Sequence, residues 1–232
     1  MARTFLDLVK RLKSECAIPG AVPSTLVGLT AESEAQRLKD WVADAWFAIL
    51  ELHPDWKFRR RSTSFTTVNG QGAYSQTQCG ITANTLGRWI LPSFRAYKTS
   101  TGFSGEYPLT AIDYDEWRDT YLFGANRTAY TSPRVVAVDP QTDGLVLGPI
   151  PLVGYTILGD YYLAPSRLSA DADLSGLPAQ HDDLGIVWKA MIDYAGYEAD
   201  SAAYQRAVAG YARFINQLER EQKPRMELCV GL

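Results

Sequence analysis

Four acidic residues form the densest group of side chains in this chain that could do catalytic chemistry. Asp113, Asp115, Glu116 and Asp119 fall within one short segment. Paired carboxylates hydrolyse glycosidic bonds, one acting as acid and the other as base or nucleophile. The same acids in the first turns of a helix also complement its dipole. We favour the second interpretation, in which the four acids are surface residues of a short helix.

The two histidines of the chain, His53 and His181, offer little more chemistry. His53 precedes a proline at the end of a predicted helix. His181 precedes Asp182 and Asp183 at a predicted helix start, where acids favour capping over metal binding or general-base catalysis. The sequence contains no nucleophile elbow, phosphate-binding loop or zinc-peptidase motif. We therefore expect no catalytic residue, no cofactor and no metal, and hence a protein that is not an enzyme.

Two other features resemble functional motifs only superficially. Residues 69–72, Asn-Gly-Gln-Gly, resemble part of a nucleotide-binding loop, but no βαβ pattern surrounds them, so we expect a turn. The three cysteines, Cys16, Cys79 and Cys229, are scattered and odd in number. That spacing favours reduced thiols over a disulfide or a metal site.

The only dense basic run is Arg59, Arg60 and Arg61. In an extended segment alternate side chains face opposite sides, so this run makes a weaker patch than it would on a helix. We expect a solvated strand start or an ion-pair site in a protein interface, and we take the three arginines as interface candidates. The net charge of −3 also argues against a protein that wraps nucleic acid with a basic face.

The composition is that of a globular protein with a sizeable core. The chain has 232 residues, of which 46% are hydrophobic, enough for one domain or two. No apolar run approaches the roughly 20 residues of a membrane span, so we expect no membrane association. The first 13 residues read as an amphipathic helix with its basic residues at the end, not as a secretory signal.

The N-terminal quarter predicts two helices. The first begins at a capping box formed by Thr4 and Asp7, and Pro19 and Gly20 end it. The second ends before the His53–Pro54 step, because the residue before a proline avoids the helical region. Its apolar residues recur at helical spacing and form a wide stripe: Leu38, Trp41, Val42, Ala45, Trp46, Ile49 and Leu50.

The middle of the chain is patterned as strands. We expect one hairpin around Asn69–Gly70, between strands at 61–68 and 73–78, and a second hairpin around residues 139–144. Consecutive hairpins predict an antiparallel sheet or small barrel. The remaining elements that the pattern predicts are strands at 88–91, 94–98 and 155–163, and a short helix at 113–123.

The C-terminal part returns to helical spacing. Apolar residues recur from Leu184 to Ala195, a break is expected at Gly196, and the pattern resumes from Tyr204 to Leu218. The fold class is therefore α+β, with a helical bundle formed by both termini around an inserted antiparallel β-rich region. The predicted domains are N-terminal helices at 1–58, the β-rich region at 59–170, C-terminal helices at 171–224, and a tail at 225–232.

Several segments together resemble the phage adaptor family, the head-to-tail connector subunits of tailed double-stranded DNA phages. The resemblance runs through nearly the whole chain. It rests on structural patterns without catalytic residues. The segments that carry it are 4–12, the Gly20–Pro23 loop, 38–46, His53 to Phe58, Tyr114 to Arg118, Tyr161 to Pro165, the acidic linker with Asp171 and Asp173, Leu177–Pro178, and His181 to Leu184.

The resemblance implies a structural protein of the virion neck, assembled in the cytoplasm of the host bacterium. Its partners would be the portal protein, neighbouring copies of itself in a twelve-fold ring, and tail or tail-completion proteins. Double-stranded DNA would pass through the ring without specific binding, which an acidic balance permits. The family's C-terminal segment often docks on the portal, and here the corresponding residues are Lys223, Arg225, Met226, Leu228, Val230 and Leu232.

Two alternatives stay open from the sequence. Within the virion, the chain could be a tail-completion or tail-terminator subunit. In a different class, it could bind or process carbohydrate with its Trp- and Tyr-rich β region and the acids from Asp113 to Asp119. A saccharide site needs exposed aromatic side chains converging over paired carboxylates, whereas a connector needs an interface spread along one edge of the subunit.

Overall fold

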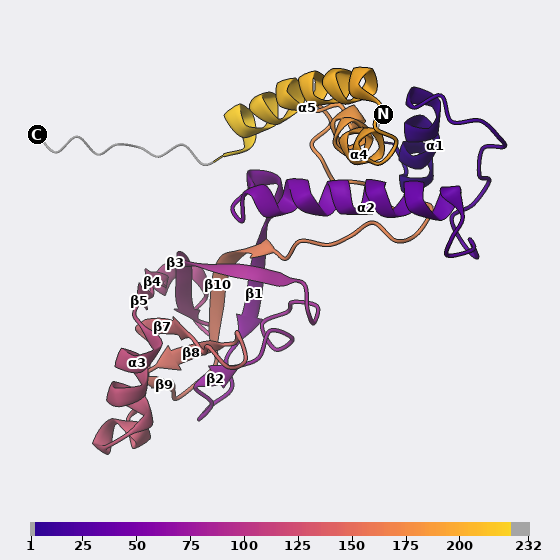
Figure 1. The fold of residues 1–232 in the computed structure, drawn as a ribbon. Coiled ribbons are helices and arrows are strands. Elements are labelled where there is room, and N and C mark those ends of the chain that lie inside the picture. The colour runs from indigo at the N-terminus through magenta and orange to yellow at the C-terminus, as the bar shows by residue number, and fades with distance from the viewer. Residues whose placement is uncertain (1–2, 224–232) are drawn as a thin grey trace, which may run out of the picture. The chain divides into compact units, whose positions relative to one another are not determined.

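The protein is described by a computed structural model over residues 3–223. It forms two compact units, drawn in Figure 1. The helical unit contains Met1–Phe58 and Pro165–Leu232, and the β unit is the segment between them, Arg59–Ala164. The predicted α+β class is confirmed, since helices from both ends of the chain form one unit and the strands form the other.

The helical unit is built around α4 (Leu184–Tyr197). The other three helices all pack against it, α2 and α5 on either side of it in Figure 1. They are α1 (Phe5–Glu15), α2 (Glu34–Leu52) and α5 (Ser201–Gln222). The segment 165–170, which the sequence pattern placed in the β-rich region, belongs to this unit, because Leu168 is buried among the helices.

The helix boundaries follow the capping residues. Thr4 and Asp7 form the predicted reciprocal capping box, and Ser33 accepts a hydrogen bond from the backbone N–H of Gln36. α2 ends at Leu52, as the His53–Pro54 step predicts. The break between α4 and α5 lies after Tyr197 rather than at Gly196, because the chain reverses through Ala199, whose φ is +56°.

The acidic linker, which contains Asp171 and Asp173 and precedes α4, is hydrogen-bonded to the N-terminal helix α1. The backbone N–H of Phe5 donates to the carbonyl of Asp173 at 2.8 Å, and that of Leu6 donates to the carbonyl of Asp171 at 3.2 Å. The Asp171 carboxylate also accepts from Thr25 Oγ1 at 2.6 Å and from the Leu26 N–H at 2.9 Å. The acidic linker therefore fixes both the start of α1 and the loop that follows it.

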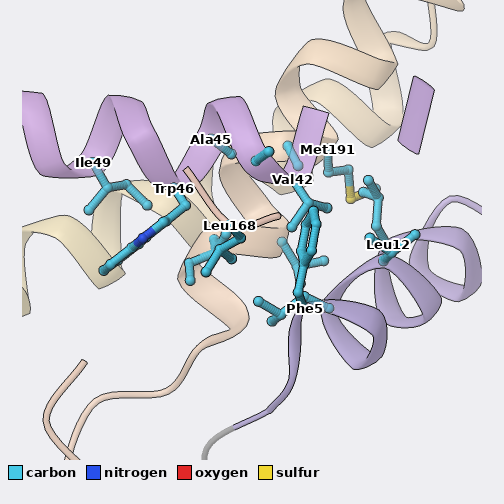
Figure 2. Packing of buried hydrophobic residues seen from close by; sticks show 14 of the residues in the cluster. Phe5, Leu12, Val42, Ala45, Trp46, Ile49, Leu168 and Met191 are labelled. Atoms are coloured by element: carbon cyan, nitrogen blue, oxygen red, sulfur yellow. The ribbon is translucent and has the colours of Figure 1, made fainter. Parts of the chain in front are cut away.

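The core of the helical unit joins residues from both ends of the chain. Figure 2 shows the side chains of Phe5, Val42, Trp46 and Met191 as members of one cluster, with Trp46 next to Ile49. Trp46 is only 4% exposed, and its ring stacks on Phe58 with centroids 6.4 Å apart. Trp46 therefore lies in a core that the N- and C-terminal helices share.

The β unit consists of two four-stranded sheets and one two-stranded pair. Their strand orders are β1-β10-β3-β4, β2-β8-β7-β5 and β6-β9. The strands of the first sheet are β1 (Arg60–Thr66), β3 (Leu86–Lys98), β4 (Tyr107–Pro108) and β10 (Tyr155–Leu163). Those of the second are β2 (Ala73–Tyr74), β5 (Thr110–Ala111), β7 (Val135–Val138) and β8 (Leu145–Gly148). The pair is β6 (Tyr130–Thr131) and β9 (Ile150–Pro151).

Short helical turns complete the β unit and its borders. The predicted helix at 113–123 is present as α3 (Tyr114–Trp117), which continues into a π-helical turn, η3 (Arg118–Leu122). The remaining turns are η1 (Lys57–Arg59), η2 (Gly102–Gly105) and η4 (Ala125–Thr128).

The first predicted hairpin is wrong, whereas the second is confirmed. A turn does occur at Asn69–Gly70, but β1 pairs with β10 and β2 pairs with β8. Seven residues of β1 find partners along β10, far more than two-residue β2 could offer, so the turn carries the chain from one sheet to the other. The hairpin at 139–144 joins β7 and β8 as expected.

Two predicted strands, 88–91 and 94–98, are one continuous strand, β3. Pro92, which cannot donate to a ladder, lies between the two predicted segments. The strand passes the proline through a bulge between the Ile90–Asp160 and Arg95–Leu158 pairs, where the Asp160 N–H donates to Ser93 Oγ at 2.8 Å. The pairing is antiparallel as predicted in this sheet, but β5–β7 and β6–β9 are parallel.

Removing the Trp46 side chain tests the shared core. We expect Trp46→Ala to lower the free energy of unfolding by about 3–5 kcal/mol, because a large aromatic side chain leaves a cavity between helices. Urea denaturation followed by circular dichroism measures this change. Coincident urea midpoints of mutant and parent would contradict the pairing of the two ends of the chain.

Gly185 tests how closely α4 and α5 approach. A Cβ at this position would lie 2.1 Å from the Phe214 ring, so we expect Gly185→Ala to destabilise the protein by at least about 1–3 kcal/mol. Gly196, near the end of the same helix, has no atom within 4 Å of such a Cβ. The control Gly196→Ala should therefore be neutral, or stabilising by up to about 1 kcal/mol, in the same denaturation experiment.

Candidate functional site

The acidic group at 113–119 is engaged in capping and ion pairing. The Asp113 carboxylate accepts from the Asp115 N–H at 3.3 Å, which caps α3. Arg118 lies 3.3 Å from the Asp115 carboxylate and 3.4 Å from that of Asp119, whose side chains are 72% and 70% exposed. Glu116 is exposed too. A glycosidase's general acid needs a partly desolvated carboxyl group, and these four residues do not provide one.

His181 is buried at the start of α4. The residue is 7% exposed, and its Nε2 lies 3.3 Å from Glu221 Oε2 of α5, within ion-pair reach but without the direction of a hydrogen bond. It lines a cleft of about 290 Å³ together with Arg3, Asp182 and Asp183. Nothing in this cleft pairs a nucleophile with a base, so its side chains have a packing role.

The sequence predicted that both acids after His181, Asp182 and Asp183, cap α4, but only one of them does so with its side chain. Asp182 accepts from the Leu184 N–H at 3.1 Å and so caps α4 as expected. Asp183 does not cap with its side chain: its carboxylate is buried and accepts from the Arg3 N–H at 2.8 Å and from Ser175 Oγ at 2.7 Å.

His53 joins the end of α2 to α5. Its Nε2 lies 2.7 Å from Glu219 Oε1, and its ring meets the Trp56 ring edge-on at 4.7 Å. The hydrogen bond from His53 lowers the pKa of Glu219 below its ordinary value, and the Lys223 ammonium adds to this effect. This histidine therefore serves the packing of two helices.

The described cysteines are not nucleophiles. Cys79 is fully buried, and desolvation raises the pKa of its thiol to about 12. Desolvation likewise raises the pKa of the Cys16 thiol to about 12. Both thiols stay protonated at neutral pH, where only a thiolate attacks or binds metal well. Within residues 3–223 no three histidine, cysteine, aspartate or glutamate side chains gather as a metal site would require.

The tryptophans form no carbohydrate-stacking surface. All six lie in the described part of the chain, and none is exposed. Trp56 is fully buried in the helical unit, and Trp89 and Trp117 are buried in the β unit. Trp56 and Trp89 therefore both belong to cores.

The three arginines of the basic run lie in three different environments. Arg59 is buried, and its guanidinium donates to the carbonyl of Leu163. Arg60 is exposed and its Nε donates to Asp160 Oδ2 at 2.9 Å, which links β1 to β10. Arg61, also exposed, donates to the carbonyl of Arg60 at 2.9 Å. Arg60 and Arg61 can therefore be reached by a partner, whereas Arg59 is part of the packing of its own unit.

Of the six tail residues proposed from the sequence, only Lys223 lies in the described part of the chain. It is the C-terminal capping residue of α5, and its Nζ lies 3.4 Å from Glu219 Oε1. Arg225, Met226, Leu228, Val230 and Leu232 lie outside the described residues.

The β unit contains a cleft with mainly apolar walls, which we call the apolar cleft. It has a volume of about 310 Å³ and lies where the start of β3 meets the β7–β8 hairpin. Leu86, Leu91 and Val138 contribute apolar side chains to it, and Arg88 and Asp143 stand at its rim. No catalytic constellation lines it, so its chemistry suits a hydrophobic side chain.

Sequence reasoning missed an exposed segment at 118–131, which we call the arm. Residues 122–128 are all exposed, and three large apolar side chains on the arm face solvent: Leu122 at 37%, Phe123 at 56% and Tyr130 at 41%. In Figure 1 the arm extends below α3, away from the strands of its own unit. The signal in the sequence was the pair Leu122–Phe123 directly before Gly124 in an otherwise polar stretch.

No helix among residues 3–223 has the length and apolar character needed to cross a membrane.

Comparison with known protein families identifies the family of this chain. No curated protein matches this chain. The family model of the SU10 adaptor protein matches residues 3–228, which include both units described above. The match runs through the helices of both termini and through the β unit between them. This chain belongs to the SU10 adaptor protein family.

Proposed function

We propose that this protein is a non-enzymatic structural subunit of a tailed phage virion. In this role, copies of the chain form a ring beneath the portal, extend the channel for double-stranded DNA, and offer the surface to which the tail attaches. The observation that carries the proposal is the family match over residues 3–228, because it includes nearly every residue that builds the two units. A role at the neck between head and tail follows from the adaptor function.

The absence of a constellation for chemistry within the described residues is consistent with a structural role. The acids at 113–119 cap and pair, both histidines contact glutamates of α5, and desolvation keeps the thiols of Cys16 and Cys79 protonated. Enzymes instead gather a nucleophile, a base and an orienting group in one place. These side chains stabilise the fold and leave its outer surfaces to partners.

The net charge of the chain suits the wall of a channel through which DNA passes without binding. A net charge of −3 gives no excess of cations to neutralise phosphates. Phosphate contacts supply most of the affinity for DNA irrespective of its sequence, so their scarcity lets the duplex pass. Arg60 and Arg61, exposed at the start of β1, remain candidates for ion pairs with a neighbouring protein.

The C-terminal tail is the proposed portal contact. α5 ends at Gln222, and beyond it Arg225, Met226, Leu228, Val230 and Leu232 combine one cation with four apolar side chains. Such a short segment cannot bury its own apolar groups, but it can fill grooves on another protein. The apolar residues would supply most of the affinity, and Arg225 would pair with an acid of the portal.

Deleting residues 225–232 tests the portal contact. The melting temperature should stay nearly unchanged, because so short a segment cannot bury its own apolar groups. Co-sedimentation with purified portal rings should be abolished. A variant with the same eight residues in scrambled order is the matched control: it too should fail to bind, since apolar side chains would no longer meet their grooves. A truncated protein that binds portals with parental affinity would place docking on the helical unit instead.

The absence of catalysis is a separate prediction. We expect no hydrolysis or group transfer on a panel of glycans and peptides, since no described carboxylate has a desolvated partner at the acidic group. Product release is measured by chromatography. Reproducible turnover that Asp115→Asn or Glu116→Gln abolishes would overturn this part of the proposal.

A further inference from the structure

We propose that the arm of one copy inserts Phe123 into the apolar cleft of the next copy, so that the two surfaces form a head-to-tail contact. The inference rests on the proposed function, since it names the surfaces through which copies of the chain meet. Both surfaces lie within the β unit, so each copy presents them in a fixed relation.

The arm is held firmly at both ends. Before the exposed tip, the Tyr121 ring packs on Gly148, where a Cβ would come within 2.5 Å of it. After the tip, β6 pairs with β9, with Tyr130 opposite Ile150. Trp117, just before the arm, is buried against Ala137 and Val146. A tip anchored in this way loses little conformational freedom on binding, which favours tight association.

The tip itself carries apolar side chains that are exposed to solvent. Phe123 is 56% exposed and Leu122 beside it is 37% exposed. Large aromatic side chains that enter a pocket are the residues that dominate the energy of protein interfaces. Phe103, at 72%, is also exposed in this unit, but it packs on Tyr97 with ring centroids 4.9 Å apart and lies outside the arm.

The apolar cleft and the arm lie at opposite ends of the same hairpin. Val138 and Asp143 of the cleft flank the turn between β7 and β8, whereas the arm is anchored at Gly148, the far end of β8. The register of the hairpin, from Val138–Leu145 to Val135–Gly148, separates the two ends by about 10 Å. Phe123 of one copy does not fill the cleft of that copy, so the cleft is available to a second.

Charge at the two surfaces is complementary. Arg127, four residues after Phe123, is exposed and makes no ion pair or hydrogen bond through its side chain with any of residues 3–223. Asp143 at the rim of the cleft is exposed, and its carboxylate is likewise unpaired within that range. Only its backbone groups are bonded there: the N–H donates to the carbonyl of Asp139 at 2.8 Å, and the carbonyl accepts from Trp89 Nε1 at 2.8 Å. An arginine beside the inserted aromatic and an acid beside the receiving cleft fit the apolar core and polar rim of protein interfaces.

A contact between two different surfaces determines the kind of assembly. Each copy uses its arm on one neighbour and its cleft on the other, which gives a heterologous contact. Such contacts close into a ring when the rotation between copies closes, and otherwise extend. The Phe123 contact is the anchor of the interface, and the surrounding surface supplies the remaining buried area that a stable interface needs.

Sedimentation velocity of the full chain at low ionic strength tests the inference. The parent should form oligomers, and Phe123→Ala should weaken self-association by about 30-fold or more, because it removes the anchoring side chain. Leu91→Gln, in the wall of the cleft, should have the same effect. The matched control Phe103→Ala removes an equally large exposed ring and should leave association unchanged. Val138→Thr, which keeps the shape of the cleft, replaces Leu91→Gln if that variant lowers the melting temperature.

Mixing the arm and cleft variants distinguishes this contact from a symmetric one. Phe123→Ala retains its cleft and Leu91→Gln retains its arm, so an equimolar mixture should form dimers and nothing larger, while each variant alone stays monomeric. Arg127→Ala and Asp143→Asn test the rim: combining them should cost no more than either alone, because both remove the same ion pair.

Three results would overturn the inference. They are a parent that stays monomeric at its highest soluble concentration, self-association that Phe123→Ala leaves unchanged, and a mixture that forms no dimer. Rings that persist in Phe123→Ala would contradict the arm contact and leave the proposed adaptor function intact. Conversely, a chain that associates through Phe123 but does not bind portal rings would contradict the proposed function and leave the arm contact standing.

Discussion

The burial of α4 is the constraint on which the rest of the helical unit depends. Ile186, Val187, Ala190 and Met191 are all fully buried, so this helix presents a wide apolar face. A helix of this kind is stable only when other elements surround it. α1 and α2 from one end of the chain and α5 from the other supply that cover, so the two ends must meet before the unit can fold. The acidic linker adds backbone hydrogen bonds to the start of α1.

This requirement also explains why the β unit can be an insertion. The chain enters the β unit at Arg59 and leaves it at Ala164. β1 and β10, which pair along seven residues, hold these two points close together. The guanidinium of Arg59 donates to the carbonyl of Leu163, and so fixes the same place. An insertion whose ends are adjacent disturbs its host little. The β unit can then carry projecting features, such as the arm and the apolar cleft, without cost to the helical core.

Periodicity predicted the helices well, because their apolar faces are read directly from the sequence. The stripe with Trp46 and the capping box at Thr4 both depend on residues close in the chain. Strand pairing depends on distant partners, which is why Asn69–Gly70 suggested a hairpin that β10 and β8 displaced. The bulge near Pro92 could not be predicted for the same reason, because it depends on how β3 pairs with β10. The structural, non-catalytic role of His53, His181 and the four acids could be predicted from the sequence. The arm and the cleft could not, because the type of a residue does not determine whether its side chain is exposed.

The central claim is that the chain is a ring-forming subunit of the neck. Electron cryo-microscopy of necks purified from virions that contain this protein tests it most directly. We expect a closed ring of helical and β units of this fold immediately beneath the portal, enclosing the DNA channel. Density for this chain on the capsid surface, in the tail fibres, or nowhere in the mature particle would contradict it.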